Sequence, residues 1–276
     1  MQELAGRTAV ITGAGSGIGR ALAITCARHQ MHLVLADVDA RGLDETAELS
    51  SQPQCLRVVT DVSKPHEVES LAQQAFGVAS DVALLFNNAG VATGGWVWES
   101  TPQDWAWLIG VNLMGVAHGI HSFVPRMLKQ GAPAHIVNTA SAAGLISVPG
   151  AAAYCASKHG VVTVSECLRH ELRQKKAAIG VSVLCPSFVQ TGIVDSERHR
   201  PADLRGSGKA HVPRDENLMR GMRGATLTAD DVARLTLDAV IAGEFYIVPH
   251  AAILEGVQQR LSAILEGHAP VAGVLA

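Results

Sequence analysis

Apolar runs and helix-like segments alternate along almost the whole chain. Short runs rich in β-branched and apolar residues predict strands, and longer segments with apolar residues at helical spacing predict helices. The predicted strands are Thr8–Thr12, His32–Asp37, Cys55–Thr60, Val82–Phe86, Ala134–Asn138, Val181–Cys185 and Phe245–Val248. The predicted helices cover about Ile18–His29, Leu43–Leu49, His66–Phe76, Gln103–Lys129, Ala153–Lys175 and Ala229–Ala242.

The predicted strands are continuously apolar and do not alternate between apolar and polar residues. This pattern is typical of parallel strands that helices cover on both faces. Repeated β–α units with short links predict an α/β fold with a doubly wound, seven-stranded parallel sheet. No internal repeat, low-complexity tract or linker divides the chain, so residues 1–276 are interpreted as a single domain.

One segment, residues 187–225, departs from this alternation and has no clean periodicity. Its charged residues are Asp195, Glu197, Arg198, Arg200, Asp203, Arg205, Lys209, Arg214, Asp215, Glu216, Arg220 and Arg223. A long irregular stretch inside a domain is typical of a functional lid or of a solvated surface insertion. Because the segment follows the sixth predicted strand, at the edge where open sheets bind ligands, we favour a substrate lid.

Composition narrows the classes of function. A net charge of −3 and a pI near 6.4 argue against a nucleic-acid-binding protein. The first predicted strand begins too early to leave room for a signal peptide, and no uninterrupted apolar stretch approaches the roughly 18 residues of a membrane span. Five cysteines without CxxC spacing indicate reduced thiols in a cytoplasmic protein, and the histidines lack a metal-binding spacing.

A glycine-rich motif, TGAGSGIG, lies between the first predicted strand and the first predicted helix at Thr12–Gly19. Glycines let the backbone approach a pyrophosphate closely, and the start of the helix offers free N–H groups and the positive end of its dipole. This context predicts the dinucleotide site of a Rossmann fold. The expected contacts are Gly13, Gly15, Ser16, Gly17, Ile18 and Gly19.

The residue that ends the second predicted strand bears on the choice of cofactor. Asp37 can accept hydrogen bonds from both ribose hydroxyls and repels a 2′-phosphate, which favours NAD over NADP. The nearby Arg41 keeps NADP open as an alternative. Asp61 and Val62 end the third predicted strand, where we expect them to meet the adenine edge.

Two residues four apart on a predicted helix suggest proton-transfer chemistry. Tyr154 and Lys158 project from one face of that helix. A phenol ionises near pH 10, and a neighbouring ammonium group lowers its pKa, so Lys158 would make Tyr154 a usable acid/base. Ser141 follows the fifth predicted strand at the same edge of the sheet, where its hydroxyl can donate to a substrate oxygen.

With these motifs the chain resembles the short-chain dehydrogenase/reductase family over nearly its whole length. The residues that carry the resemblance are Thr12–Gly19, the sequence Asn-Asn-Ala-Gly at 87–90, Asn112, Ser141, Tyr154, Lys158, Pro186 and Thr191. Ser187 is a departure, because many members have glycine after the proline. One bacterial branch that the chain also resembles includes dehydrogenases of benzylic alcohols and has a C-terminal helix after Tyr246–Pro249.

The resemblance implies a role for each matching residue. Tyr154 would be the general acid/base, Ser141 would polarise the substrate oxygen, and Lys158 would lower the pKa of Tyr154 and hold the nicotinamide ribose. Asn112 would kink its long helix and anchor a proton relay through Lys158. The cofactor would also contact Asn88, Ala89 and Gly90 on its adenosine side and Pro186, Val189 and Thr191 near its nicotinamide. The family usually forms tetramers or dimers, so a homo-oligomer is expected.

The tryptophans bear on the size and polarity of the substrate. Trp96 and Trp98 either flank the mouth of the site, which would suit a bulky apolar or aromatic substrate, or simply pack. We expect Trp105 and Trp107 to pack their helix on the body. Met219 and Met222 either adapt the lid to substrate shape or pack within it.

The leading hypothesis is an NAD-dependent oxidoreductase that acts on a small-molecule secondary alcohol or ketone. The alternatives are a non-catalytic dinucleotide sensor or scaffold on the same fold, and a lyase or epimerase with the same catalytic residues.

Overall fold

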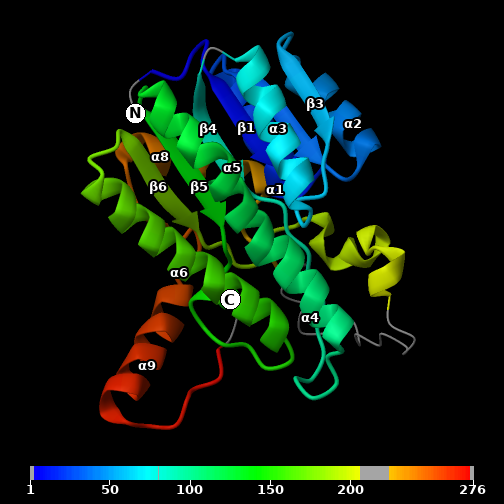
Figure 1. The fold of residues 1–276 in the computed structure, drawn as a ribbon. Helices are drawn as coiled ribbons and strands as arrows, with labels where there is room; N and C mark the ends of the chain where they lie inside the picture. The colour runs from blue at the N-terminus through cyan, green and yellow to red at the C-terminus, as the bar shows by residue number, and fades with distance from the viewer. Residues whose placement is uncertain (1–2, 80, 206–223, 274–276) are drawn as a thin grey trace.

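Seven parallel strands form one sheet in the order β3-β2-β1-β4-β5-β6-β7 (Figure 1). The computed structural model describes residues 3–79, 81–205 and 224–273. The strands are β1 Thr8–Thr12, β2 His32–Asp37, β3 Cys55–Val59, β4 Val82–Asn87, β5 Ala134–Thr139, β6 Ile179–Leu184 and β7 Tyr246–Ile247. Each predicted strand is present. The main differences are that β6 begins two residues earlier than predicted and that β7 has only two residues.

Helices cover both faces of the sheet, which confirms the doubly wound Rossmann architecture. One face carries α1 Gly17–Arg28, α2 Ala40–Ser50 and α8 Ala229–Ala242, and the other carries α3 Pro65–Val78, α5 Gly115–Gln130 and α6 Ala152–Gln174 (Figure 1). Neighbouring residues of a strand pack into different hydrophobic clusters. Ile11 packs in the cluster that contains Leu22 and Leu237, whereas Val10 packs in the cluster that contains Phe123 and Leu172. The strands are apolar on both sides because each side meets a helix layer.

The strand order reverses between β1 and β4, and the ends of these two strands are tied together. The hydroxyl of Thr12, the last residue of β1, accepts hydrogen bonds from the N–H groups of Asn88 at 2.9 Å and Ala89 at 3.1 Å. Such a switch point opens a crevice beyond the carboxyl ends of the strands, where ligands bind in open α/β sheets.

The predicted helix Gln103–Lys129 is interrupted near its middle. It consists of α4 Pro102–Leu108, a π-helical turn (η1, Ile109–Met114) and α5. Among the described residues, only Pro102–Gln130 forms a helix long and apolar enough to cross a membrane, and half of its most apolar window is buried inside the fold. Core helices can meet the same criterion of length and hydropathy, and burial to this extent is typical of them.

The described first part of the segment after β6 contains regular structure that its sequence pattern does not suggest. Two short 3₁₀ helices, η3 Gly192–His199 and η4 Ala202–Leu204, occupy its first half. Residues 206–223, which include Met219 and Met222, lie outside the described residues. Near the C-terminus, α9 Ile253–Glu266 is the expected last helix.

Candidate active site

A cavity of about 1970 Å³ lies beyond the carboxyl ends of the strands, and most of the predicted site residues line it. It reaches from the glycine loop to Tyr154. Seventeen of the predicted residues line it: Gly13, Ser16, Gly17, Ile18, Gly19, Asp37, Asp61, Val62, Asn88, Ala89, Gly90, Ser141, Tyr154, Lys158, Pro186, Val189 and Thr191. The two predicted residues that do not line it, Gly15 and Asn112, support residues that do.

In the glycine loop, there is no room for a side chain at Gly13 or Gly19. A Cβ on Gly19 would lie 2.0 Å from the carbonyl oxygen of Gly13, and a Cβ on Gly13 would lie 2.7 Å from the Cα of Ala89. Gly13 also has φ +67°, which favours glycine. The bare backbone at the start of α1 fits the pyrophosphate of a dinucleotide, since helix N-termini bind anions.

Asp37 is fixed at the end of β2 by backbone donors. Its carboxylate accepts hydrogen bonds from the N–H groups of Gly15 at 2.8 Å and Asp39 at 3.0 Å. A Cβ on Gly15 would lie 3.0 Å from this carboxylate, which explains why a glycine stands there although it does not line the cavity. The carboxylate is therefore positioned before any ribose binds.

Arg20 on α1 and Arg41 on α2 are both paired with the same glutamate. Arg20 lies 2.9 Å and Arg41 3.2 Å from the carboxylate oxygens of Glu45. Arg20 also donates to the carbonyl oxygen of Gly15 at 2.5 Å. Neither arginine lines the cavity, and the side chain of Arg41 is 89% exposed.

The residues expected at the adenine edge are held by short-range contacts. Asp61 accepts hydrogen bonds from the backbone N–H of Ser63 at 2.9 Å and from its hydroxyl at 2.7 Å. The carbonyl oxygen of Val62 lies 2.9 Å from Nδ1 of His118 on α5. Through His118, α5 thus fixes the backbone at Val62, just after β3.

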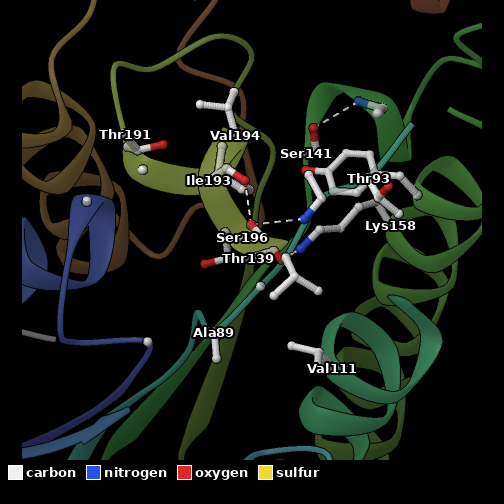
Figure 2. Close-up of a pocket in the computed structure, with 18 of the residues that line it drawn as sticks. Ala89, Thr93, Val111, Thr139, Ser141, Lys158, Thr191, Ile193, Val194 and Ser196 are labelled. Atoms are coloured by element: carbon white, nitrogen blue, oxygen red, sulfur yellow. Dashed lines mark hydrogen bonds between the residues drawn. The ribbon is translucent and has the colours of Figure 1, made fainter. Parts of the chain in front are cut away.

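Three of the four residues predicted for catalysis lie together: Ser141 and Lys158 are on the same side of the cavity (Figure 2), and Tyr154 lies beside both. Ser141 begins the short η2 helix, Ala142–Gly144, and its hydroxyl accepts from the N–H of Ala143 at 3.1 Å. Lys158 is buried, and its Nζ donates to the carbonyl oxygen of Thr139 at 2.9 Å and lies 5.9 Å from the centre of the Tyr154 ring.

Burial shifts the pKa values of both Tyr154 and Lys158, and the expectation that Lys158 lowers the pKa of Tyr154 stays a prediction. Burial raises the pKa of the Tyr154 hydroxyl, and its hydrogen bond with Ser141 only partly opposes this. Burial also lowers the pKa of Lys158 to about 8. The phenol of Tyr154 therefore keeps its proton at neutral pH.

Asn112 lies inside the π-helical turn and is fully buried. Its side chain accepts from the N–H of Val91 at 2.8 Å and donates to the carbonyl oxygen of Val91 at 3.0 Å and to the Ser157 hydroxyl at 3.1 Å. It thus locks the cavity loop after β4 to the helix that carries Tyr154. At the residue where the resemblance implied a kink, the structure has this π turn, and π turns are frequent at functional sites.

The opposite side of the cavity comes from the segment after β6. Figure 2 shows Ile193, Val194 and Ser196 of η3 on one side and Ser141 and Lys158 on the other. The Ser196 hydroxyl accepts from the N–H of Ala92, in the loop after β4, at 3.3 Å. η3 is thus attached to the far wall of the cavity.

Ser187, which stands where many members of the family that the sequence resembles have glycine, has a structural partner. Its N–H donates to Nδ1 of His250 at 3.2 Å, so the loop after Pro186 is joined to the segment before α9. Burial lowers the pKa of His250, and the neutral ring can accept this hydrogen bond.

The tryptophans divide differently from the sequence-based expectation. Trp96 lines the cavity and stacks on the exposed Trp98, with ring centres 5.4 Å apart. Trp107 packs its helix as expected, but it also lines the cavity and packs in the cluster that contains Tyr154. The position of Trp107 at the cavity was missed because a helical pattern identifies which face of a helix is buried but does not identify the neighbours of that face.

Two threonines were also missed. Thr12 ties together the ends of β1 and β4, and Thr139 holds Lys158. Both end a strand, and Thr12 also begins the glycine motif, but the sequence analysis gave neither threonine a role. Among the described residues, no cluster of His, Cys, Asp or Glu is arranged to hold a metal ion.

Comparisons with known proteins extend over nearly the whole chain. A family model described as short chain dehydrogenase matches residues 7–202. A crystal structure of a short chain dehydrogenase/reductase from Burkholderia phymatum in complex with NAD has a TM-score of 0.96 and 48% identity, and the match covers 99% of each chain.

Curated relatives show the same full-length similarity. A CLA biosynthesis dehydrogenase/reductase of Lactiplantibacillus plantarum is 31% identical, and the match covers 98% of this chain and 97% of the relative. A C alpha-dehydrogenase of a Sphingobium strain is also 31% identical, with 98% and 89% covered.

Proposed function

The chain belongs to the short-chain dehydrogenase/reductase family, a family of oxidoreductases that use a nicotinamide dinucleotide, and from this premise we propose that it interconverts a secondary alcohol and a ketone with NAD(H). The observation that carries the proposal is the position of Ser141, Tyr154 and Lys158 in the cavity that begins at the glycine loop. When bound, the nicotinamide supplies the hydride to the ketone or accepts it from the alcohol.

The side chains perform the proton transfer. In reduction, the Tyr154 hydroxyl donates its proton to the substrate oxygen as the carbonyl carbon gains the hydride, and in oxidation the phenolate takes the proton back. Ser141 donates a hydrogen bond to the same oxygen and stabilises its developing charge. Lys158 holds the nicotinamide ribose, and Asn112 supports a proton relay beyond Lys158.

We propose NAD as the preferred cofactor. The Asp37 carboxylate lies where a ribose hydroxyl donor is expected, and a 2′-phosphate there would be repelled. Arg20 and Arg41, the arginines that a 2′-phosphate would need, are paired with Glu45. The similar protein from Burkholderia phymatum has NAD bound, which supports this choice.

We propose a bulky apolar or aromatic substrate. Trp96 is 52% exposed at the cavity, and its ring is held in place by stacking on Trp98 with only 2° between the ring planes. A fixed aromatic face favours flat apolar groups, because little side-chain freedom is lost on binding. Replacing Trp96 with alanine is expected to raise KM for aryl ketones more than KM for small aliphatic ketones.

We further propose that residues 1–276 act as one domain, with residues 187–225 as a substrate lid. The described part of this segment supports a lid because Ile193–Glu197 line the cavity. A cytoplasmic location and assembly into a dimer or tetramer complete the proposal.

Oxidation of NADH with a panel of aryl ketones, steroids and sugars tests the function. The proposal predicts turnover with at least one aryl ketone, with deuteride from labelled NADH recovered on the carbinol carbon. Tight NADH binding without turnover of any of them would favour a dinucleotide sensor or scaffold. Product formation with no label in the product would favour a lyase or epimerase.

A further inference from the structure

One arginine of the segment after β6 is buried although it is charged. The side chain of Arg200 is 2% exposed. It lies 2.6 Å from Oδ1 of Asp104 on α4, lies 3.1 Å from a carboxylate oxygen of Glu197, and donates to the carbonyl oxygen of Leu204 at 2.8 Å. A buried cation needs such partners, because leaving it unpaired in the interior is costly.

The principal partner of Arg200 already has a structural task. Oδ2 of Asp104 accepts from the N–H of Thr101 at 2.8 Å and from its hydroxyl at 2.7 Å, which forms the capping box that begins α4. Oδ1 is left for Arg200. One carboxylate therefore both starts the helix and binds the segment after β6.

Arg200 also touches an aromatic wall of the active site. Its guanidinium lies 4.9 Å from the ring of Trp107. Trp107 lines the cavity and packs in the cluster that contains Val91 and Tyr154. A change at Arg200 therefore reaches the residues around the phenol through a single layer of contacts.

The segment that contains Arg200 bounds the cavity. Ile193–Glu197 line it, and the Ser196 hydroxyl provides a separate attachment to Ala92. Two contacts that are distant in sequence, Arg200 to Asp104 and Ser196 to Ala92, thus fasten η3 and η4 to the region after β4. No residue of α4 is joined to η3 or η4 by another ion pair within the described part of the chain.

We propose that Arg200 is a positioning residue for the reaction: its buried ion pair with Asp104 holds residues 192–205 over the substrate end of the cavity and steadies Trp107 beside Tyr154. The inference rests on the proposed function for its kinetic consequence, but not for its structural one. Arg200 does not line the cavity, so it acts through the segment that it holds.

The chain contains a matched arrangement on its surface. Thr228 and Asp231 form the capping box of α8, and Asp231 pairs with Arg234 at 3.4 Å. Here the side chains of the arginine and aspartate are 61% and 39% exposed, and neither lines the cavity. Exposed pairs of this kind contribute little, so Arg234→Met is the control for Arg200→Met.

The test uses the full-length protein with Arg200→Met, Arg200→Lys, Arg234→Met and the double variant Arg200→Met/Asp104→Asn. Hydrogen exchange is followed in peptides from residues 192–205, and kcat and KM are measured with NADH and a ketone that the wild type reduces. The double variant leaves no unpaired carboxylate at Asp104, and Glu197, the other partner of Arg200, is 44% exposed, so the double variant substitutes for Arg200→Met if that protein does not fold.

We expect Arg200→Met to speed exchange in 192–205 and to raise KM for the ketone, each by at least about tenfold, because removing one partner of a buried pair is disruptive. Arg200→Lys should recover part of both effects. The pH profile of kcat should not move, because Tyr154 is unchanged. Arg234→Met should change either quantity by less than about twofold.

Wild-type exchange in 192–205 and a wild-type KM in a folded Arg200 variant would overturn the proposal. Equal effects in Arg234→Met would also overturn it, because they would indicate a general loss of stability. If the wild type itself reduces no ketone, the proposed function fails, and the exchange experiment still decides whether Arg200 holds the segment.

Discussion

Burial shifts the pKa values of Tyr154 and Lys158 in opposite directions. Burial disfavours a charge on either group, so the phenol holds its proton more tightly and the amine holds its proton less tightly. At neutral pH the Tyr154 phenol is therefore protonated, which is the form that the proposed ketone reduction requires. This arrangement suits ketone reduction without any prior ionisation.

The direction of the Tyr154 shift predicts how each reaction depends on pH. Oxidation of the alcohol needs the phenolate, so its kcat should rise as the pH increases through the alkaline range, because the pKa is raised. Reduction needs the protonated phenol, so its kcat should stay level through neutral pH and fall only in the same alkaline range. Rate profiles in both directions between about pH 6 and 11 check this, and alcohol oxidation that is fastest below neutral pH would contradict it.

Asp37 is the residue that we expect to set cofactor preference. Asp37→Ser removes the ribose partner and the charge that repels a 2′-phosphate, so kcat/KM should fall with NAD and rise with NADP. The ratio of the two values should shift by at least about tenfold. Asp44→Ser, on the exposed face of α2 and paired with Arg57, is the control and should leave the ratio unchanged. An unchanged ratio in Asp37→Ser would remove the argument for NAD.

At the scale of elements, the strands and most helices followed from the sequence because their apolar patterns are local. The π turn did not, because it depends on contacts that Asn112 makes with Val91 and Ser157, which are distant in the chain. The 3₁₀ helices η3 and η4 were missed for the same reason. They are held by Ser196 and Arg200 through partners about a hundred residues away.

The start of α1 offers a direct test of the glycine loop. Gly19→Ala would push a Cβ to within 2.0 Å of the Gly13 carbonyl oxygen, so the loop must shift, and NADH affinity and thermal stability should both fall. Gly77→Ala on α3 has no heavy atom within 4 Å of the new Cβ and should gain up to about 1 kcal/mol of stability. Calorimetric NADH titration and thermal unfolding measure both. Normal NADH binding by Gly19→Ala would contradict the proposed path of the pyrophosphate.

At the scale of the whole molecule, the candidate site joins elements from almost the full length of the chain. The cavity is lined from Gly13 in the first β–α turn to Gly273 near the C-terminus. The sequence could predict the motif residues, because most of the motifs follow a predicted strand and Tyr154 and Lys158 share one face of a predicted helix. It could not predict Gly273, which donates its N–H to the carbonyl oxygen of Ser147 at 2.8 Å, because no local pattern marks where a tail returns.

Assembly is a prediction that belongs to this scale. Large apolar side chains remain exposed on the single chain, including Met114 after Asn112, Leu128 on α5, and Leu261 and Leu265 on α9. Exposed apolar surface of this kind favours a second copy as its cover. Light scattering on the purified protein should give two or four times the 28.9 kDa of one chain. A monomer at micromolar concentration would contradict the expected oligomer.

The central claim is that the Tyr154 hydroxyl exchanges its proton with the substrate oxygen beside a bound nicotinamide. The most direct measurement is the turnover of Tyr154→Phe together with its affinity for NADH, because the substitution removes only the hydroxyl. The account predicts an NADH dissociation constant close to that of the wild type and a kcat lower by a factor on the order of 10² to 10⁴. A Tyr154→Phe enzyme that turns over at the wild-type rate would contradict it.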